Sequence, residues 1–168
     1  MHILRKALLT LVAAAFLVTA LSAPLTANEQ EVALIPFKGY DLEGKPIDVS
    51  QNIGNKAVML IFWASWCPSC RTEVPKLNEL ASKYAGRGME FIGVNVGYND
   101  TYKRAKAFAQ KTGMTYPNLF DSTGTIGEQY GLQGVPTVVI ADKKGFIRYY
   151  GHATPNITEE TFKQLMAN

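Results

Sequence analysis

The two cysteines of this chain, Cys67 and Cys70, lie close together in the stretch FWASWCPSC (62–70). A disulfide across so short a loop restricts the unfolded chain very little, which disfavours a purely structural bond. A structural zinc site takes about four ligands, and beyond its first 27 residues the chain adds only His152. We therefore predict a redox-active Cys67–Cys70 disulfide that works without a further cofactor or a bound metal.

The cysteine pair lies where a predicted strand meets a predicted helix. Residues 56–64 form an unbroken apolar run, typical of a central strand covered on both faces. A helix is predicted from Pro68 to about Gly86. Cys67 would then stand at the helix N-terminus, where free N–H groups and the helix dipole stabilise a thiolate. We expect Cys67 to be the exposed attacking thiol and Cys70 the more buried resolving thiol.

The rest of the chain alternates strand and helix patterns. A β-hairpin is predicted at 35–40 and 45–49. Further strands are predicted at 89–97, at 115–120 and on both sides of the turn DKKG (142–145). Helices are predicted from a cap at Asp100 or Thr101 to Gly113, over 123–130, and after a cap at Thr158. This order predicts an α/β fold with a mixed central β-sheet flanked by helices.

The first 27 residues have the pattern of an export signal. A basic start, MHILRK, precedes the uncharged run Ala7–Leu21, and small residues follow, with cleavage expected after Ala27. The run is shorter than the ~18–20 apolar residues of a membrane span. We predict that residues 1–27 are a signal peptide or an uncleaved N-terminal anchor. Residues 28–168 are expected to form the folded domain, located in the periplasm or on the outer face of the cytoplasmic membrane.

The charge of the chain excludes one class of partner. The formal net charge is +3, and without residues 1–27 there remain 15 lysines and arginines against 14 acids. So balanced a domain has no electrostatic basis for binding nucleic acid, and none is predicted. Contact with a membrane is expected only if the leader is retained.

Several motifs together resemble the thioredoxin superfamily. They are the block WASWCPSCRTEVP with Pro75, and the stretch YGLQGVPTVVIADKKGFI. Within that superfamily the chain is similar to the extracytoplasmic TlpA/ResA/CcmG-like branch, from about residue 30 to its end. The resemblance implies a thioredoxin-like fold with an N-terminal β-hairpin and a central helix/strand insertion.

The resemblance also implies a set of residues that shape the site. The Val135-Pro136 bond would be cis and would face the cysteines, with Val135, Pro136 and Thr137 beside a bound substrate chain. The alternative is a proline that only starts a strand. Trp66 and Pro68 would shape the active site and its docking surface, although Trp66 could equally belong to the core.

Glu73 matches an active-site glutamate of the ResA-like proteins, which is implied to tune the cysteines and to help deprotonate Cys70. One helical turn separates the two residues. The alternative is a solvated acid paired with Lys76. The chain departs from cytoplasmic thioredoxin at Ile61, where that family has a buried aspartate.

By resemblance, the chain is a thiol–disulfide oxidoreductase that reduces disulfides of envelope proteins. Implied substrates are apocytochrome c or a copper-centre assembly protein, and a membrane electron donor would reset the Cys67–Cys70 disulfide. Two alternatives remain open. One is a disulfide-forming oxidant or isomerase, because Pro68-Ser69 does not decide the redox poise. The other is a Cu(I)-binding or catalytically idle docking module, because thiolates accept soft metals.

Overall fold

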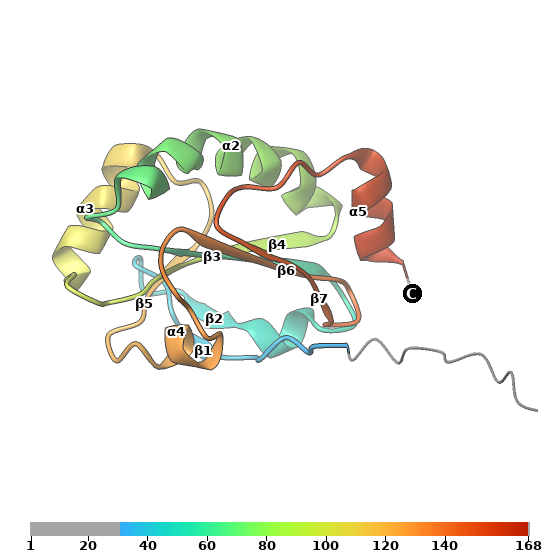
Figure 1. Ribbon diagram of the computed structural model, residues 1–168, viewed down its shortest axis with the longest axis horizontal. Coiled ribbons are helices and arrows are strands. Elements are labelled where there is room, and N and C mark those ends of the chain that lie inside the picture. The colour runs from blue at the N-terminus through green and yellow to red at the C-terminus, as the bar shows by residue number, and fades with distance from the viewer. Residues whose placement is uncertain (1–30, 168) are drawn as a thin grey trace, which may run out of the picture. The chain divides into compact units, whose positions relative to one another are not determined.

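The computed structural model describes residues 31–167. The predicted signal peptide or anchor at 1–27 lies outside the described residues. The central sheet consists of β3 (Ala57–Trp63), β4 (Met89–Asn95), β5 (Asn118–Phe120), β6 (Thr137–Ala141) and β7 (Ile147–Gly151). Its strand order is β5-β4-β3-β6-β7, and Figure 1 labels these strands. The first three strands are parallel to one another, whereas β6 and β7 run antiparallel to their neighbours, so the predicted mixed sheet is confirmed.

The helices also follow the predicted order. They are α2 (Pro68–Tyr84), α3 (Tyr102–Thr112), α4 (Thr125–Gln129) and α5 (Glu159–Met166). Two short 3-10 segments, η1 (Val49–Asn52) and η2 (Ala85–Arg87), complete the helical structure of the described residues. Between β4 and β6 lie α3 and β5, the expected central helix/strand insertion, and then α4. Between residues 31 and 167, the structure holds no helix long and apolar enough to cross a membrane.

The predicted hairpin is confirmed in a shorter form. Strands β1 (Lys38–Tyr40) and β2 (Pro46–Asp48) pair in antiparallel fashion. The second strand ends before Val49 because the Asp48 carboxylate accepts the N–H of Ser50 at 3.1 Å and caps η1. Asp48 therefore turns the chain one residue earlier than the apolar pattern predicts.

Helix ends are set by side chains that were mostly identifiable in the sequence. The Thr101 hydroxyl accepts the N–H of Arg104 at 3.2 Å and caps α3, so Asp100 is not the cap. Gly113 ends α3 in the left-handed region, with a φ of 69°. Thr158 caps α5 in the same way, as predicted.

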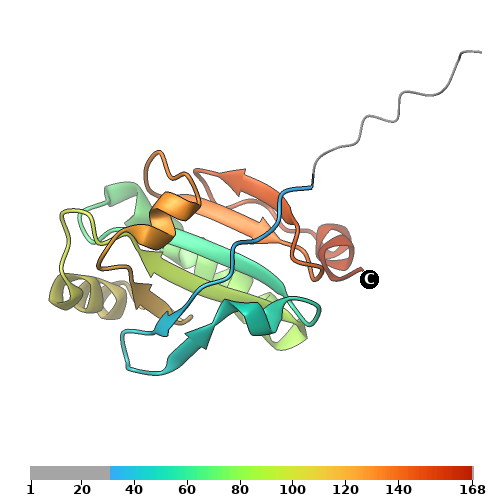
Figure 2. The same ribbon diagram turned by 90° about the horizontal axis from the view of Figure 1, so that it is seen from below.

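The sheet has a hydrophobic layer on each face, because successive side chains of a strand point to opposite sides. Met59 and Ile61 of β3 pack with buried residues of α2 and α5 on one face. On the other face, Leu60 and Phe62 pack with residues that precede and follow the hairpin. Figures 1 and 2 show α2 and α5 on one side of the sheet, and the hairpin and α4 on the other. The unbroken apolar run of β3 therefore reflects a strand buried on both faces.

Candidate active site

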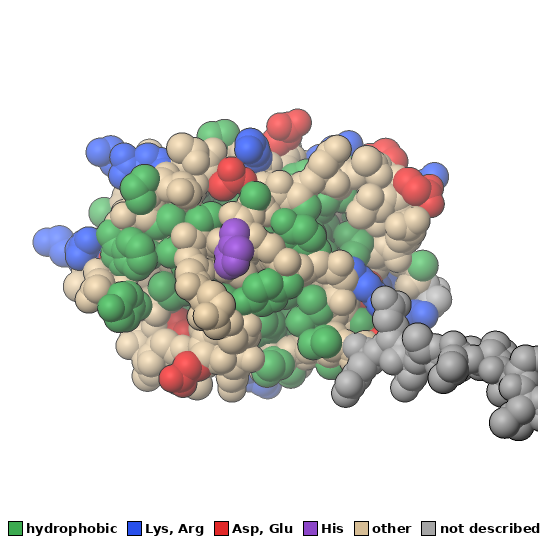
Figure 3. Space-filling model, viewed as in Figure 1, with side chains coloured by type: hydrophobic (Ala, Val, Ile, Leu, Met, Phe, Trp, Pro, Cys, Tyr) green, Lys and Arg blue, Asp and Glu red, His purple; other side chains and the backbone are tan. Residues whose placement is uncertain are grey.

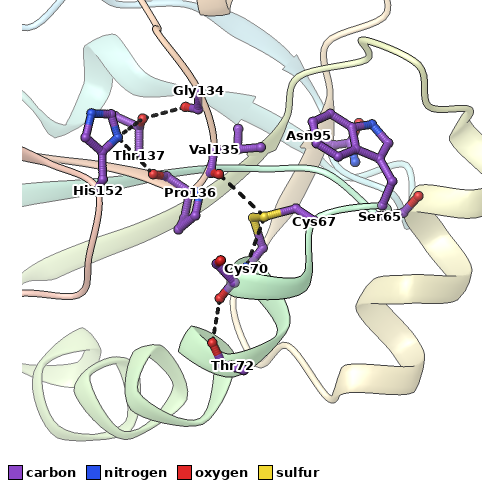
Figure 4. The surroundings of a disulfide bond; sticks show 12 residues. Ser65, Cys67, Cys70, Thr72, Asn95, Gly134, Val135, Pro136, Thr137 and His152 are labelled. Atoms are coloured by element: carbon purple, nitrogen blue, oxygen red, sulfur yellow. Dashed lines mark hydrogen bonds between the residues drawn. A yellow bond between two sulfur atoms is a disulfide. The ribbon is translucent and has the colours of Figure 1, made fainter.

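The two cysteines lie at the junction of β3 and α2. Cys67 is the N-cap residue of α2, and its Sγ accepts the N–H of Cys70 at 3.1 Å (Figure 4). The two residues form a disulfide, with their Cα atoms 5.3 Å apart. Cys67 is therefore placed as predicted, with a helix N–H group directed at its sulfur. That arrangement favours negative charge on Sγ once the disulfide is opened.

The burial of the cysteines differs from the prediction. Cys67 is 4% exposed and Cys70 is 3% exposed, so the expectation of an exposed Cys67 is wrong for the disulfide form. Both residues belong to a hydrophobic cluster with Trp63 and Phe108. The loop before β6 also covers Cys67, because the carbonyl oxygen of Val135 lies 3.6 Å from its Sγ.

The loop before β6 faces the disulfide, and its Val135-Pro136 peptide bond is cis, as expected. Thr137 has a different place from the one expected. It is fully buried, and its hydroxyl donates to the carbonyl oxygen of Gly134 at 2.7 Å. Thr137 therefore shapes the loop from within. Val135 is half-buried with its carbonyl oxygen against the Cys67 sulfur, and Pro136 is buried beside the cysteines (Figure 4).

His152 supports the same loop, a role that the sequence did not suggest. It follows β7, and its Nδ1 lies 3.2 Å from the carbonyl oxygen of Pro136 and 3.2 Å from the hydroxyl of Thr137. Because Thr137 already donates its hydroxyl proton to Gly134, Nδ1 is the donor in both contacts. Figure 3 shows this side chain at the surface among hydrophobic side chains.

Trp66 is exposed on the other side of Cys67. It is 42% exposed, so the alternative of a core residue is wrong. Its indole N–H donates to the carbonyl oxygen of Tyr98 at 2.8 Å, which holds the ring against the loop between β4 and α3. Pro68, the first residue of α2, is also exposed. Trp66 and Pro68 thus present accessible surface next to the buried disulfide; that they shape a docking surface stays a prediction.

A mainly apolar groove of about 470 Å³ lies next to this surface. Its lining includes Trp66 and Tyr98, Leu132 and Val135 of the loop before β6, and Glu128 of α4. Trp66 directly precedes Cys67, and Val135 contacts the Cys67 sulfur, so the groove runs beside the N-terminal cysteine. An extended chain in this groove would have its side chains against apolar and aromatic surface.

Glu73 lies on α2 one turn beyond Cys70, with both carboxylate oxygens engaged. One oxygen accepts the N–H of Thr154 at 2.9 Å, and the other lies 3.2 Å from the Lys76 ammonium. Burial alone would raise the pKa of Glu73, but the bonds from Thr154 and Lys76 outweigh it and hold that pKa below its usual value. The pair with Lys76 is therefore real, and Glu73 also ties α2 to the segment that follows β7.

A second carboxylate, Asp100, lies beside the segment that leads into the cysteines. It accepts hydrogen bonds from the N–H of Ser65 at 2.7 Å and from the amide of Asn95 at 2.8 Å. In the sequence, Asp100 was predicted only as a possible cap of the helix that ends at Gly113. Thr101 can cap this helix alone, so a second capping residue directly before it is not needed. That surplus was the one feature of the sequence that could have indicated another role for Asp100.

Comparison with known proteins agrees with this geometry. A family model described as the AhpC/TSA family matches residues 31–150. The thiol-disulfide oxidoreductase ResA of Geobacillus thermodenitrificans is 35% identical over 124 residues, which are 74% of this chain and 68% of that protein. The thiol:disulfide interchange protein DsbE of Escherichia coli K12 is 36% identical over 113 residues, covering 66% of this chain and 58% of the other.

A solved structure of a related protein has the same fold. The thiol:disulfide interchange protein of the thioredoxin family from Chlorobium tepidum superposes with a TM-score of 0.65 and 26% identity. The match covers 83% of this chain and 96% of that one. The two chains therefore share the same fold over most of their lengths.

Proposed function

Because this chain belongs to the AhpC/TSA family and is a thiol–disulfide oxidoreductase of the ResA and DsbE type, we propose that it works in the reducing direction, outside the cytoplasm. The family, the thioredoxin-like fold and the enzyme class agree with the sequence predictions. The direction, the location and the substrates are the proposal. The export pattern of residues 1–27 supports the location.

The observation that carries the mechanism is the position of Cys67 at the N-terminus of α2. In the reduced protein, the helix N–H groups stabilise its thiolate, which attacks one sulfur of a substrate disulfide. A new bond forms between Cys67 and the substrate, the substrate disulfide breaks, and one substrate thiolate leaves. The Cys70 N–H, 3.1 Å from Sγ in the disulfide form, is the donor that supports this charge.

Cys70 then completes the reduction. Its thiolate attacks the Cys67 sulfur, the bond to the substrate breaks, and the second substrate thiolate leaves. The substrate gains two electrons, and the Cys67–Cys70 disulfide forms. We assign Glu73 the role of taking the thiol proton of Cys70, directly or through water. Glu73 is ionised at neutral pH and can accept a proton. Its lowered pKa makes it a weak base, so it passes the proton on rather than retaining it.

The cycle requires a reductant, because the resulting disulfide must receive two electrons and two protons. A dithiol donor in the membrane, acting by the same exchange chemistry, supplies them in this proposal. The substrates are disulfides of exported proteins such as apocytochrome c or copper-centre assembly proteins. A stretch of substrate chain beside its disulfide would occupy the groove next to Cys67, which brings the substrate sulfur to the attacking thiol.

The test is the reduction potential of the purified protein, equilibrated with a dithiol buffer. A reductant of the thioredoxin type lies near about −270 mV and a strong oxidant near about −120 mV. We expect a value in the lower range. A value near that of the oxidant would reverse the direction of the reaction and overturn the proposal.

A disulfide-forming oxidant or isomerase is the second candidate, favoured by the proline directly after Cys67, because such a proline also occurs in oxidants. The same measurement decides between them. A Cu(I) carrier would instead bind Cu(I) tightly only in its reduced form. A catalytically idle docking domain would tolerate Cys67→Ser without loss of function.

A further inference from the structure

A fully buried carboxylate anchors the segment that leads into the cysteines. The side chain of Asp100 is 0% exposed. It accepts four hydrogen bonds, two of them from the N–H and the hydroxyl of Ser65, both at 2.7 Å. The other donors are the Asn95 amide at 2.8 Å and the N–H of Thr101 at 2.9 Å. A buried ionised group is stable only when it is hydrogen-bonded in this way.

These bonds connect two segments that form one wall of the groove. Ser65 directly precedes Trp66, and Asp100 lies shortly after Tyr98. The indole N–H of Trp66 donates to the carbonyl oxygen of Tyr98 at 2.8 Å, which makes a second link between the same two segments. Trp66 and Tyr98 are both exposed and both line the groove, so their own packing does not fix them. The hydrogen bonds of Asp100 are buried contacts between the two segments that carry these rings.

We propose that Asp100 is a positioning residue that sets the affinity of the groove for a substrate chain, by holding Trp66 and Tyr98 as one wall. This inference rests on the proposed function, which places a substrate chain in that groove. Asp100 touches neither the groove nor the sulfurs, and acts through Ser65 and the loop after β4. Its effect is therefore on recognition of an extended protein substrate, and the exchange chemistry of the cysteines does not depend on it.

Asp100→Asn is the informative substitution because it keeps the volume and removes an acceptor. All four partners of Asp100 are hydrogen-bond donors, and an amide NH₂ group placed among them makes donor face donor. The exposed guanidinium of Arg104 lies 3.8 Å from the Asp100 carboxylate, beyond hydrogen-bond distance. Arg104 therefore does not compensate for the substitution. Ser65→Ala is a milder second variant that removes only the hydroxyl bond and leaves the carboxylate in place.

Asp142→Asn provides a matched control at the other end of β6. Asp142 is also a buried aspartate, and it accepts the N–H of Phe146 at 2.9 Å and the guanidinium of Arg148 at 2.6 Å. It lies in the turn between β6 and β7, away from the groove. The Asp142→Asn variant therefore shows how far the loss of a buried carboxylate destabilises the protein when the groove is not involved.

The experiment compares two probes with the reduced full-length protein. One is a peptide with an oxidised Cys-x-x-Cys-His motif and flanking residues, which can occupy the groove. The other is hydroxyethyl disulfide, which has the reacting bond and nothing to bind there. We expect Asp100→Asn to lower kcat/KM for the peptide about tenfold, Ser65→Ala to lower it less, and the rate with hydroxyethyl disulfide to stay unchanged in both. In Asp142→Asn, the ratio of the rate with the peptide to the rate with hydroxyethyl disulfide should equal that of the wild type.

A parallel measurement follows the wall itself. Acrylamide quenching reports Trp66, because Trp63 is buried at 1% exposure. Quenching should increase in Asp100→Asn and stay at the wild-type value in Asp142→Asn. The inference is overturned if both probes slow by the same factor, if neither slows, or if the wild type prefers the peptide no more than the control probe. The proposed function is tested separately by the wild-type reduction potential, so the two can fail independently.

Discussion

The Sγ of Cys67 lies 3.6 Å from the carbonyl oxygen of Val135. In the disulfide form this sulfur has no hydrogen, so the contact is one of packing. It places the attacking cysteine directly against the loop before β6 (Figure 4). Val135 of that loop and Trp66, which precedes Cys67, both line the groove. In the proposed reaction, a substrate sulfur that reaches Cys67 would lie beside that loop.

The first prediction concerns the order of attack. Cys70→Ser should accumulate mixed disulfides with substrate proteins or with the probe peptide, because Cys67 attacks and nothing releases it. Cys67→Ser should accumulate none, since the remaining thiol lacks the N-terminal position in α2. Mass spectrometry of the trapped species checks this. Trapping through Cys70 instead would reverse the assigned roles.

The second prediction concerns Glu73. Glu73→Gln keeps an oxygen that can accept the Thr154 N–H but removes the group that takes a proton. We expect release of the mixed disulfide to slow about tenfold or more at neutral pH, with the initial attack little changed. Stopped-flow kinetics of the two steps measures this. Glu79→Gln, an exposed position on the same helix, is the control, and an equal effect there would refute the role.

The third prediction tests the contact between His152 and the loop before β6. The contacts of His152 run through its Nδ1. The side-chain nitrogen of asparagine lies as many bonds from its own Cα as Nδ1 does, so His152→Asn can keep these contacts. The longer glutamine side chain places its nitrogen farther out, so His152→Gln cannot. We expect His152→Gln to lower kcat/KM for the peptide about threefold and His152→Asn to stay near the wild type. Equal rates for the two variants would show that Nδ1 does not matter.

The fourth prediction follows from the pKa of Asp100. Burial alone would raise this pKa, but hydrogen bonds from Asn95 and Ser65 outweigh it and hold the pKa below its usual value of 3.8. The folded form therefore binds this proton less readily than the unfolded form. The stabilisation is fully present above the unfolded pKa, and it is lost as the pH falls through the folded pKa.

Urea unfolding at a series of pH values measures that loss. Other carboxylates with lowered pKa values, among them Glu73 and Asp48, also weaken the fold in acid. Asp100→Asn lacks only the part of the acid destabilisation that Asp100 causes. The free energy of unfolding of this variant should therefore fall less than that of the wild type between neutral pH and about pH 3. Parallel curves for the variant and the wild type would contradict the prediction.

The fifth prediction concerns packing inside the sheet. A Cβ added at Gly93 of β4 would collide with the side chain of Asn118 and come within 3.0 Å of the Trp63 indole nitrogen. Both neighbours are buried, so Gly93→Ala should lower the free energy of unfolding by about 2 kcal/mol or more. Gly86→Ala, with open space around it, should change it by less than about 0.5 kcal/mol. Urea denaturation of both variants decides this.

Local signals in the sequence were sufficient for much of the fold. The unbroken apolar run that became β3, the caps at Thr101 and Thr158, and the stop at Gly113 each act within a few residues of the chain. Cys67 at the start of α2 follows from the same local pattern. The motifs around the cysteines also sufficed to identify the family and the type of enzyme.

Only the tertiary structure determined how the site is enclosed and supported. Cys67 is buried because a loop far along the chain closes over it, and Asp100, His152 and Tyr98 join the site through contacts between distant segments. No periodicity or spacing records such contacts, since each depends on how the strands pack side by side. The sequence by itself therefore determined the elements and their chemistry, and the packing of the sheet decided which side chains meet.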